Sequence, residues 1–161
     1  MKMKNSKLSF SAIFRAFHRS ETGGALVETA LTLPVLVTLL LGSVEFARVA
    51  YASIEVANAA KAAVSYGAQT ITTEADTTGI QTVAANDASD LTGLTTTAST
   101  SFICSDNSAS TGLNTDCTGS QIETILTVTT SASYSPIVSI PGFRGPYTLT
   151  GRAVQKVLKG N

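Results

Sequence analysis

The sequence has little that could support catalysis. It contains no tryptophan, and its only histidine, His18, lies among the first 23 residues. Ser-His-Asp and Cys-His arrangements need an imidazole base, so a chain without this leader cannot form them. No phosphate-binding glycine loop is present, because neither Lys-Ser nor Lys-Thr follows Gly23-Gly24. We therefore predict that the protein is not an enzyme and binds no cofactor.

Charge is also scarce and unevenly distributed. Charged residues make up 14% of the chain, and the formal net charge is zero. Residues 1–23 hold five basic residues and one acid, Glu21, whereas the rest holds six basic and ten acidic residues, a net of −4. This balance gives no electrostatic footprint for nucleic acid. A basic leader before a slightly acidic body predicts a membrane protein with a cytoplasmic N-terminus.

There are only two cysteines, Cys104 and Cys117, in a stretch rich in Ser, Thr, Asp, Asn and Gly. With no histidine nearby they cannot supply the four ligands of a zinc site, so no metal is predicted. A disulfide that closes a polar loop is the preferred interpretation for a segment outside the cytoplasm. Two unpaired thiols would be the alternative for a cytoplasmic chain.

One long apolar segment stands out against this background. Residues 29–44 read TALTLPVLVTLLLGSV without a charge, and adding residues 24–28 gives 21 residues. As a helix they would extend about 31 Å, enough to cross a hydrocarbon core. A retained membrane anchor is the preferred interpretation. The alternatives are a cleaved signal peptide, with weak cleavage candidates between Ala47 and Ala52, and a buried core helix.

The helical pattern continues beyond the apolar segment. Residues 45–66 contain neither glycine nor proline and are dense in alanine, the best helix former. We therefore expect one helix of about 40 residues that ends near Gly67, with Pro34 and Gly42 as weak points. Three- and four-residue spacing predicts an apolar stripe on one face of its second half, made of Phe46, Val49, Ala50, Ser53, Ala57, Ala60 and Val64.

Glu28 is the one carboxylate inside the 21-residue segment. A charge near the bilayer centre costs about 2.5 kcal/mol or more. Either Glu28 lies at the interface, or the helix begins after it, or a cation offsets the cost. A cut between Gly23 and Gly24 would supply that cation, because the new amine of Gly24 could pair with Glu28 of a neighbouring copy.

Four features lie close together in the N-terminal part of the chain: a basic leader ending in Gly23, the segment Gly24-Ala-Leu-Val-Glu28, VEFARVAY at 44–51 and ANAAKAAVSYGA at 57–68. Together they resemble the TadE-like pseudopilins of the Tad (Flp) pilus system. The resemblance covers roughly residues 20–68. It implies that a prepilin peptidase cuts after Gly23, that Glu28 is the fifth mature residue and an assembly contact, and that other pilins and the pilus assembly machinery are partners.

The remainder of the chain predicts an α+β fold. Residues 77–91 place Ile80, Val83, Ala84, Ala88 and Leu91 on one helical face. Threonine-rich segments at 95–103, 123–134 and 147–158 read as three antiparallel strands that the helix of residues 46–66 covers. Residues 69–79 and 105–120 read as loops or disordered linkers. Asp87 and Asp90 are interpreted as a solvated helix face.

These predictions divide the chain into a basic leader (1–23), a transmembrane segment (24–44), a helical continuation (45–68) and an exposed Ser/Thr-rich domain (69–161). The preferred function is a minor pseudopilin in the assembly, tip or base of a Tad/Flp-type pilus for adhesion or secretion. The protein would lie in the bacterial inner membrane with its C-terminal domain outside the cytoplasm. A membrane-anchored extracytoplasmic binding module, and a protein released by signal cleavage, are the alternatives.

Overall fold

The computed structural model describes residues 21–113, 115–138 and 145–158. In chain order its elements are α2 (Glu21–Gly67), α3 (Ile71–Ala75), α4 (Thr77–Asp87), β1 (Thr95–Cys104), β2 (Ala109–Ser110), β3 (Ile122–Tyr134) and β4 (Tyr147–Lys156). Two compact units are present, one up to Val44 and one from Glu45 onward. The leader up to residue 20 lies outside the described residues.

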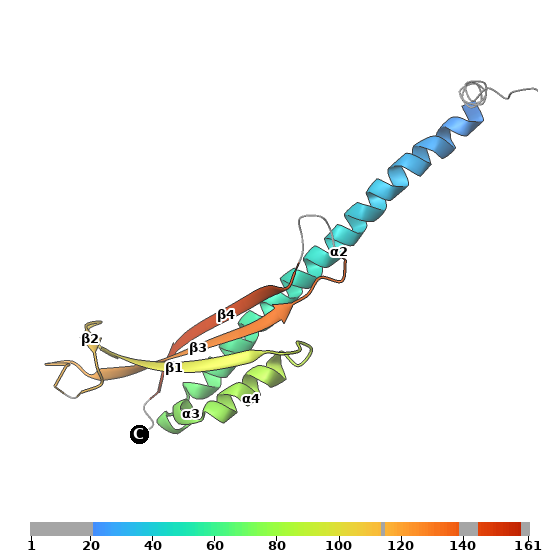
Figure 1. Cartoon of the computed structure of the whole chain (residues 1–161). Helices are drawn as coiled ribbons and strands as arrows, with labels where there is room; N and C mark the ends of the chain where they lie inside the picture. The colour runs from blue at the N-terminus through green and yellow to red at the C-terminus, as the bar shows by residue number, and fades with distance from the viewer. Residues whose placement is uncertain (1–20, 114, 139–144, 159–161) are drawn as a thin grey trace, which may run out of the picture. The chain divides into compact units, whose positions relative to one another are not determined.

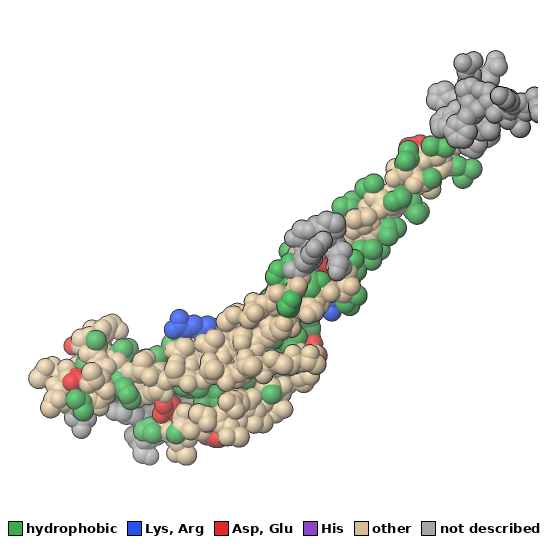
Figure 2. All heavy atoms as spheres, viewed as in Figure 1, with side chains coloured by type: hydrophobic (Ala, Val, Ile, Leu, Met, Phe, Trp, Pro, Cys, Tyr) green, Lys and Arg blue, Asp and Glu red, His purple; other side chains and the backbone are tan. Residues whose placement is uncertain are grey.

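The long N-terminal helix is confirmed. Helix α2 has 47 residues and ends at Gly67, as the alanine-rich run without glycine or proline over residues 45–66 predicted. Its side chains between Gly24 and Val44 are exposed or half-buried, and Figure 2 shows hydrophobic side chains over the surface of this segment. The apolar side chains of this segment are therefore not buried within their own unit.

The exposed domain is a two-layer α+β structure (Figure 1). Its antiparallel sheet has the order β2-β1-β3-β4, so the three predicted strands are present and a short fourth strand joins them. Central strand β3 alternates along its length, and Leu126, Val128, Thr130, Ala132 and Tyr134 are buried. The opposite face carries mainly threonine and serine, which explains why these strands are poor in apolar residues.

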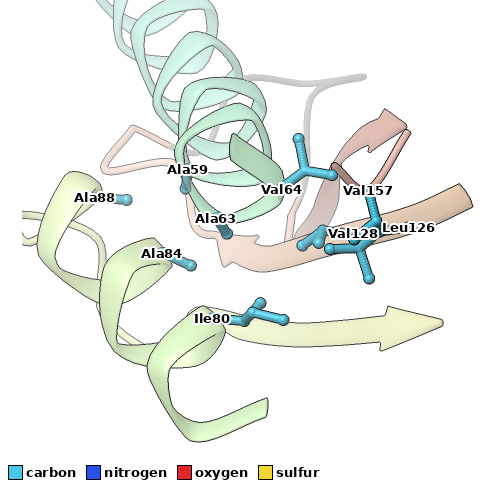
Figure 3. Close-up of a cluster of buried hydrophobic side chains, with 9 residues drawn as sticks. All are labelled: Ala59, Ala63, Val64, Ile80, Ala84, Ala88, Leu126, Val128 and Val157. Atoms are coloured by element: carbon cyan, nitrogen blue, oxygen red, sulfur yellow. The ribbon is translucent and has the colours of Figure 1, made fainter. Parts of the chain in front are cut away.

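Two helices cover the buried face of the sheet. Helix α4 packs with α2 and the strands in one hydrophobic core (Figure 3). Helix α4 and its C-cap contribute Ile80, Ala84 and Ala88 to this core. The remaining members of this core are Ala59, Ala63, Val64, Leu126, Val128 and Val157. Helix α4 ends at Asp87, four residues earlier than predicted, because Ala88 takes a non-helical conformation and closes the helix with its N–H on Ala84.

The predicted stripe on α2 is partly wrong. Phe46 is 75% exposed and Ala50 is exposed, whereas Ala52, Val56 and Ala59 are buried against the sheet. Small side chains let the helix approach closely: Thr130 donates from Oγ1 to the carbonyl of Val56 at 2.7 Å. An added Cβ at Gly151 would lie 2.5 Å from that same carbonyl oxygen. Close backbone approach, rather than bulk hydrophobicity, decides which face of α2 is buried.

Residues 69–79 are not a disordered linker. They form α3 and the start of α4, and a capping box begins α3, with Thr70 and Thr73 each bonding the other's backbone N–H. Tyr66 donates a 2.8 Å hydrogen bond to Asp76, and Asp76 accepts from the N–H of Gly79 to cap α4. Local side-chain to backbone bonds thus hold a segment that has few apolar residues.

Candidate functional site

Residues 24–44 of α2 contain five polar side chains, and four of them form hydrogen bonds with the backbone of their own helix. Hydroxyls donate to the carbonyl four residues earlier at 2.7–2.9 Å, from Thr29, Thr32, Thr38 and Ser43. Such bonds remove the cost of exposing a hydroxyl in hydrocarbon. The carboxylate of Glu28 is different, because no described side chain or backbone donor contacts it. Glu28 is therefore the one polar side chain between residues 24 and 44 that lacks a partner in the described part of the chain.

Gly24 lies inside the helix, yet the fold does not require a glycine there. A Cβ built at Gly24 meets nothing within 4 Å. Glycine in a helix interior costs about 1 kcal/mol relative to alanine, and no described close contact repays this cost.

Pro34 interrupts the hydrogen-bond ladder of the same segment. Proline has no N–H to give to the carbonyl of residue 30. Beside it, Pro34, Val35, Thr38 and Leu39 line an open hollow of about 290 Å³ with a mainly apolar surface. Gly42 follows, where an added Cβ would also meet nothing within 4 Å. The surface around Pro34 and Gly42 is thus open within this unit.

A second cluster surrounds Glu45, the first charged residue after the apolar segment, and the sequence did not reveal it. Glu45 is 3% exposed. It accepts hydrogen bonds from the Tyr134 hydroxyl at 2.7 Å and from the N–H groups of Ile137 and Val138 at 2.8 and 3.1 Å. The bond from Tyr134 and these N–H groups hold the pKa of Glu45 below its ordinary value, against the opposing effect of burial.

Arg48 completes this cluster. Its Nη1 lies 3.3 Å from Glu45, one helical turn away, and its guanidinium lies 5.5 Å from the centre of the Tyr134 ring. Burial is the main cause that raises the pKa of Tyr134, followed by its bond to the Glu45 carboxylate. The sequence does place Glu45 three residues before Arg48, a spacing that allows an ion pair on one helix face. It gives no sign that Tyr134, 89 residues later, bonds the same carboxylate.

The disulfide between Cys104 and Cys117 is present, with the two Cα atoms 5.5 Å apart. It joins the end of β1 to the loop that leads into β3, so the polar stretch 105–116 is closed into a loop. Asp116 bonds the backbone and side chain of Thr111 at 2.7 Å, which orders this loop further. Among the described residues no group of three or more His, Cys, Asp or Glu side chains could hold a metal ion.

These features define a class of protein: a single long helix, apolar and exposed in its N-terminal half, that continues into a disulfide-bonded α+β domain. In the part of the chain that the structure describes, one helix, Gly23–Gly67, is long and apolar enough to cross a membrane, with a mean hydropathy of 2.0 in its most apolar stretch.

Residues 23–65 match the family model described as TadE-like protein. This match covers 43 of the 161 residues and lies within residues 20–68, the segment that carries the resemblance to TadE-like proteins of Tad pilus systems. A comparison with curated proteins and one with solved structures each found no match.

Proposed function

We propose that this protein is a minor pseudopilin: a structural subunit, not an enzyme, that is anchored in the inner membrane by residues 24–44 and joins a Tad-type pilus or its assembly base. A prepilin peptidase removes the leader between Gly23 and Gly24. Glu28 then pairs with the new N-terminal amine of an adjacent subunit. The disulfide-bonded domain faces the extracytoplasmic side.

The observation that carries this proposal is the isolation of the Glu28 carboxylate. The four hydroxyls around it bond their own helix, whereas Glu28 has no partner among the described residues. An unpaired carboxylate in an apolar segment costs about 2.5 kcal/mol or more. A cation from a neighbouring subunit at the same depth would offset that cost, and a cleaved chain carries one on its first residue.

Two further observations support assembly. Gly24 has open space around its Cα, so a recognition sequence explains it better than packing does. Thr38 and Gly42 are four residues apart on a surface that nothing described covers. Small residues at this spacing let two helices approach closely within a membrane.

The cut is tested by N-terminal sequencing of the protein extracted from membranes of cells that hold a Tad system. We expect the sequence to begin at Gly24. A start at Met1 would support an uncleaved anchor, and a start beyond Ala47 would show signal cleavage and contradict both anchoring and assembly.

Glu28→Gln tests the pairing, with Thr29→Val, its neighbour in the same segment, as the matched control. We expect Glu28→Gln to leave membrane insertion intact and to reduce the amount crosslinked to pilins at least tenfold, the factor that about 1.4 kcal/mol of lost pairing produces. Thr29→Val should crosslink as the wild type does. Equal crosslinking by Glu28→Gln would remove the proposed role of Glu28.

A further inference from the structure

The unit from Glu45 onward contains a cavity of about 520 Å³ beside the first turns of its part of α2. Its lining includes Arg48 and Tyr51 from α2, Asp90 and Thr92 from the segment after α4, and Ser133 and Ser135 at the end of β3. One cation, one carboxylate and four hydroxyl-bearing side chains thus line a single space. We propose that this cavity binds a zwitterionic phospholipid headgroup, with the phosphate on Arg48 and the amine on Asp90.

Arg48 has hydrogen-bonding capacity left for a phosphate. A guanidinium carries five N–H donors, and only Nη1 contacts a described acceptor, at 3.3–3.4 Å from the oxygens of Glu45. Glu45 itself already accepts three shorter bonds from Tyr134, Ile137 and Val138. The arginine is therefore weakly held by its neighbour, and its side chain is 41% exposed.

The depth of Arg48 selects a lipid as the source of the phosphate. This inference rests on the membrane anchoring proposed above. Arg48 is the fourth residue after Val44, the last residue of the uncharged run, and four residues advance about 6 Å along a helix. The headgroup layer on each side of a bilayer is about 5–8 Å thick. Lipid phosphate is thus the most concentrated anion where Arg48 lies.

Asp90 selects the kind of headgroup. It lines the same cavity as Arg48, and its negative charge, together with that of Glu55, raises the pKa of the nearby Tyr51. A second negative group would be repelled there, whereas an ammonium group would be attracted. Phosphatidylethanolamine carries its amine two carbon atoms from its phosphate oxygen and therefore supplies both an anion for Arg48 and a cation for Asp90. Phosphatidylglycerol has the phosphate but no amine.

The test measures lipid retention by native mass spectrometry of the full-length chain, released from membranes into detergent and supplied with each lipid. We expect the wild type to retain one phosphatidylethanolamine and to prefer it over phosphatidylglycerol. Arg48→Gln should lower the retained fraction at least tenfold. Asp90→Asn should remove the preference between the two lipids. Arg152→Gln, which changes an arginine on the open face of the sheet, is the matched control and should bind as the wild type does.

Thr92→Trp provides a second variant, because Thr92 is exposed and a bulky side chain there fills the cavity without removing the contacts of Arg48 with Glu45. It should also abolish retention, and far-UV circular dichroism verifies that each variant is folded. Equal retention by Arg48→Gln or by Thr92→Trp would overturn the proposal. So would displacement of the lipid by inorganic phosphate at equal concentration, which would indicate a site for free phosphate. No preference for phosphatidylethanolamine in the wild type would overturn the assignment to Asp90.

Membrane fractionation separates this proposal from the function on which it rests. A chain found entirely outside membranes would contradict the anchor and the lipid site together. A chain that stays in membranes and crosslinks to pilins, but whose Arg48→Gln variant retains lipid normally, would contradict only the lipid site.

Discussion

The hydroxyl of Tyr134 donates a 2.7 Å hydrogen bond to the carboxylate of Glu45, which lies 89 residues earlier in the chain. Glu45 begins the compact domain, and Tyr134 ends its central strand. The same carboxylate accepts the N–H groups of Ile137 and Val138. One side chain of α2 therefore fixes both the end of β3 and the chain that leaves it.

Tyr134→Phe should destabilise the domain by about 1.5–3 kcal/mol, the usual effect of losing a hydrogen bond to a charged group. The ring and its packing remain, so only the hydroxyl is tested. Urea unfolding of the detergent-solubilised chain, followed by far-UV circular dichroism, provides the measurement. Ser101→Ala, which removes an exposed hydroxyl of β1, is the control and should change stability by less than about 0.5 kcal/mol. Similar effects from the two variants would show that the Glu45 contact contributes nothing particular.

Stability should also fall in acid through Glu45. Its pKa in the folded domain is lowered from 4.5, chiefly by the Tyr134 hydroxyl. A lowered pKa contributes stability above the unfolded value, and this contribution is lost as the pH falls through the folded value. The urea midpoint of the wild type should therefore drop between about pH 5 and pH 3.

Glu45→Gln separates this contribution from that of other carboxylates. Asp76, Asp106 and Asp116 also have lowered pKa values, because hydroxyl and N–H groups donate to them. They should produce a drop in the variant as well. We expect that drop to be smaller than in the wild type, although the variant is less stable at neutral pH. An equal drop in both proteins would contradict the role of Glu45.

Removal of the disulfide should lower the free energy of unfolding by about 3 kcal/mol. Cys104 and Cys117 are 13 positions apart, and closing a loop of this size restricts the unfolded chain by about that amount. The double variant Cys104→Ala/Cys117→Ala tests this by urea unfolding. Alkylation without reductant should leave the mass of the wild type unchanged. A mass increase from two alkyl groups would show that the thiols are free in the isolated protein.

Gly151→Ala should be among the most damaging small substitutions. Its Cβ would lie 2.5 Å from the Val56 carbonyl oxygen and 2.8 Å from the Cα of Ala57, and backbone atoms cannot move aside as a flexible side chain can. Overpacking of this kind costs about 1–3 kcal/mol. Thr150→Ala, the exposed preceding residue of β4, is the control for urea unfolding. A Gly151→Ala protein as stable as this control would show that α2 and β4 separate easily.

Local signals in the sequence predicted the elements well. The alanine-rich run without glycine or proline over residues 45–66 placed the end of α2 at Gly67, and alternation in residues 123–134 placed β3. Both follow from periodicity within one segment. By contrast, α3 and the short strand β2 were missed, since five residues and two residues give too little pattern to detect.

The sequence by itself determined the anchor-like helix, the α+β class of the domain, the disulfide and the resemblance of residues 20–68 to TadE-like proteins, because each depends on residues close together in the chain or on a recognisable motif. Only the tertiary structure decided that Phe46 is exposed while Val56 is buried, and that Glu45 meets Tyr134. The same holds for the cavity that brings Arg48 and Asp90 together. These depend on how closely α2 can approach β3 and β4, which Gly151 and the alanines of α2 set through contacts between residues far apart in the chain.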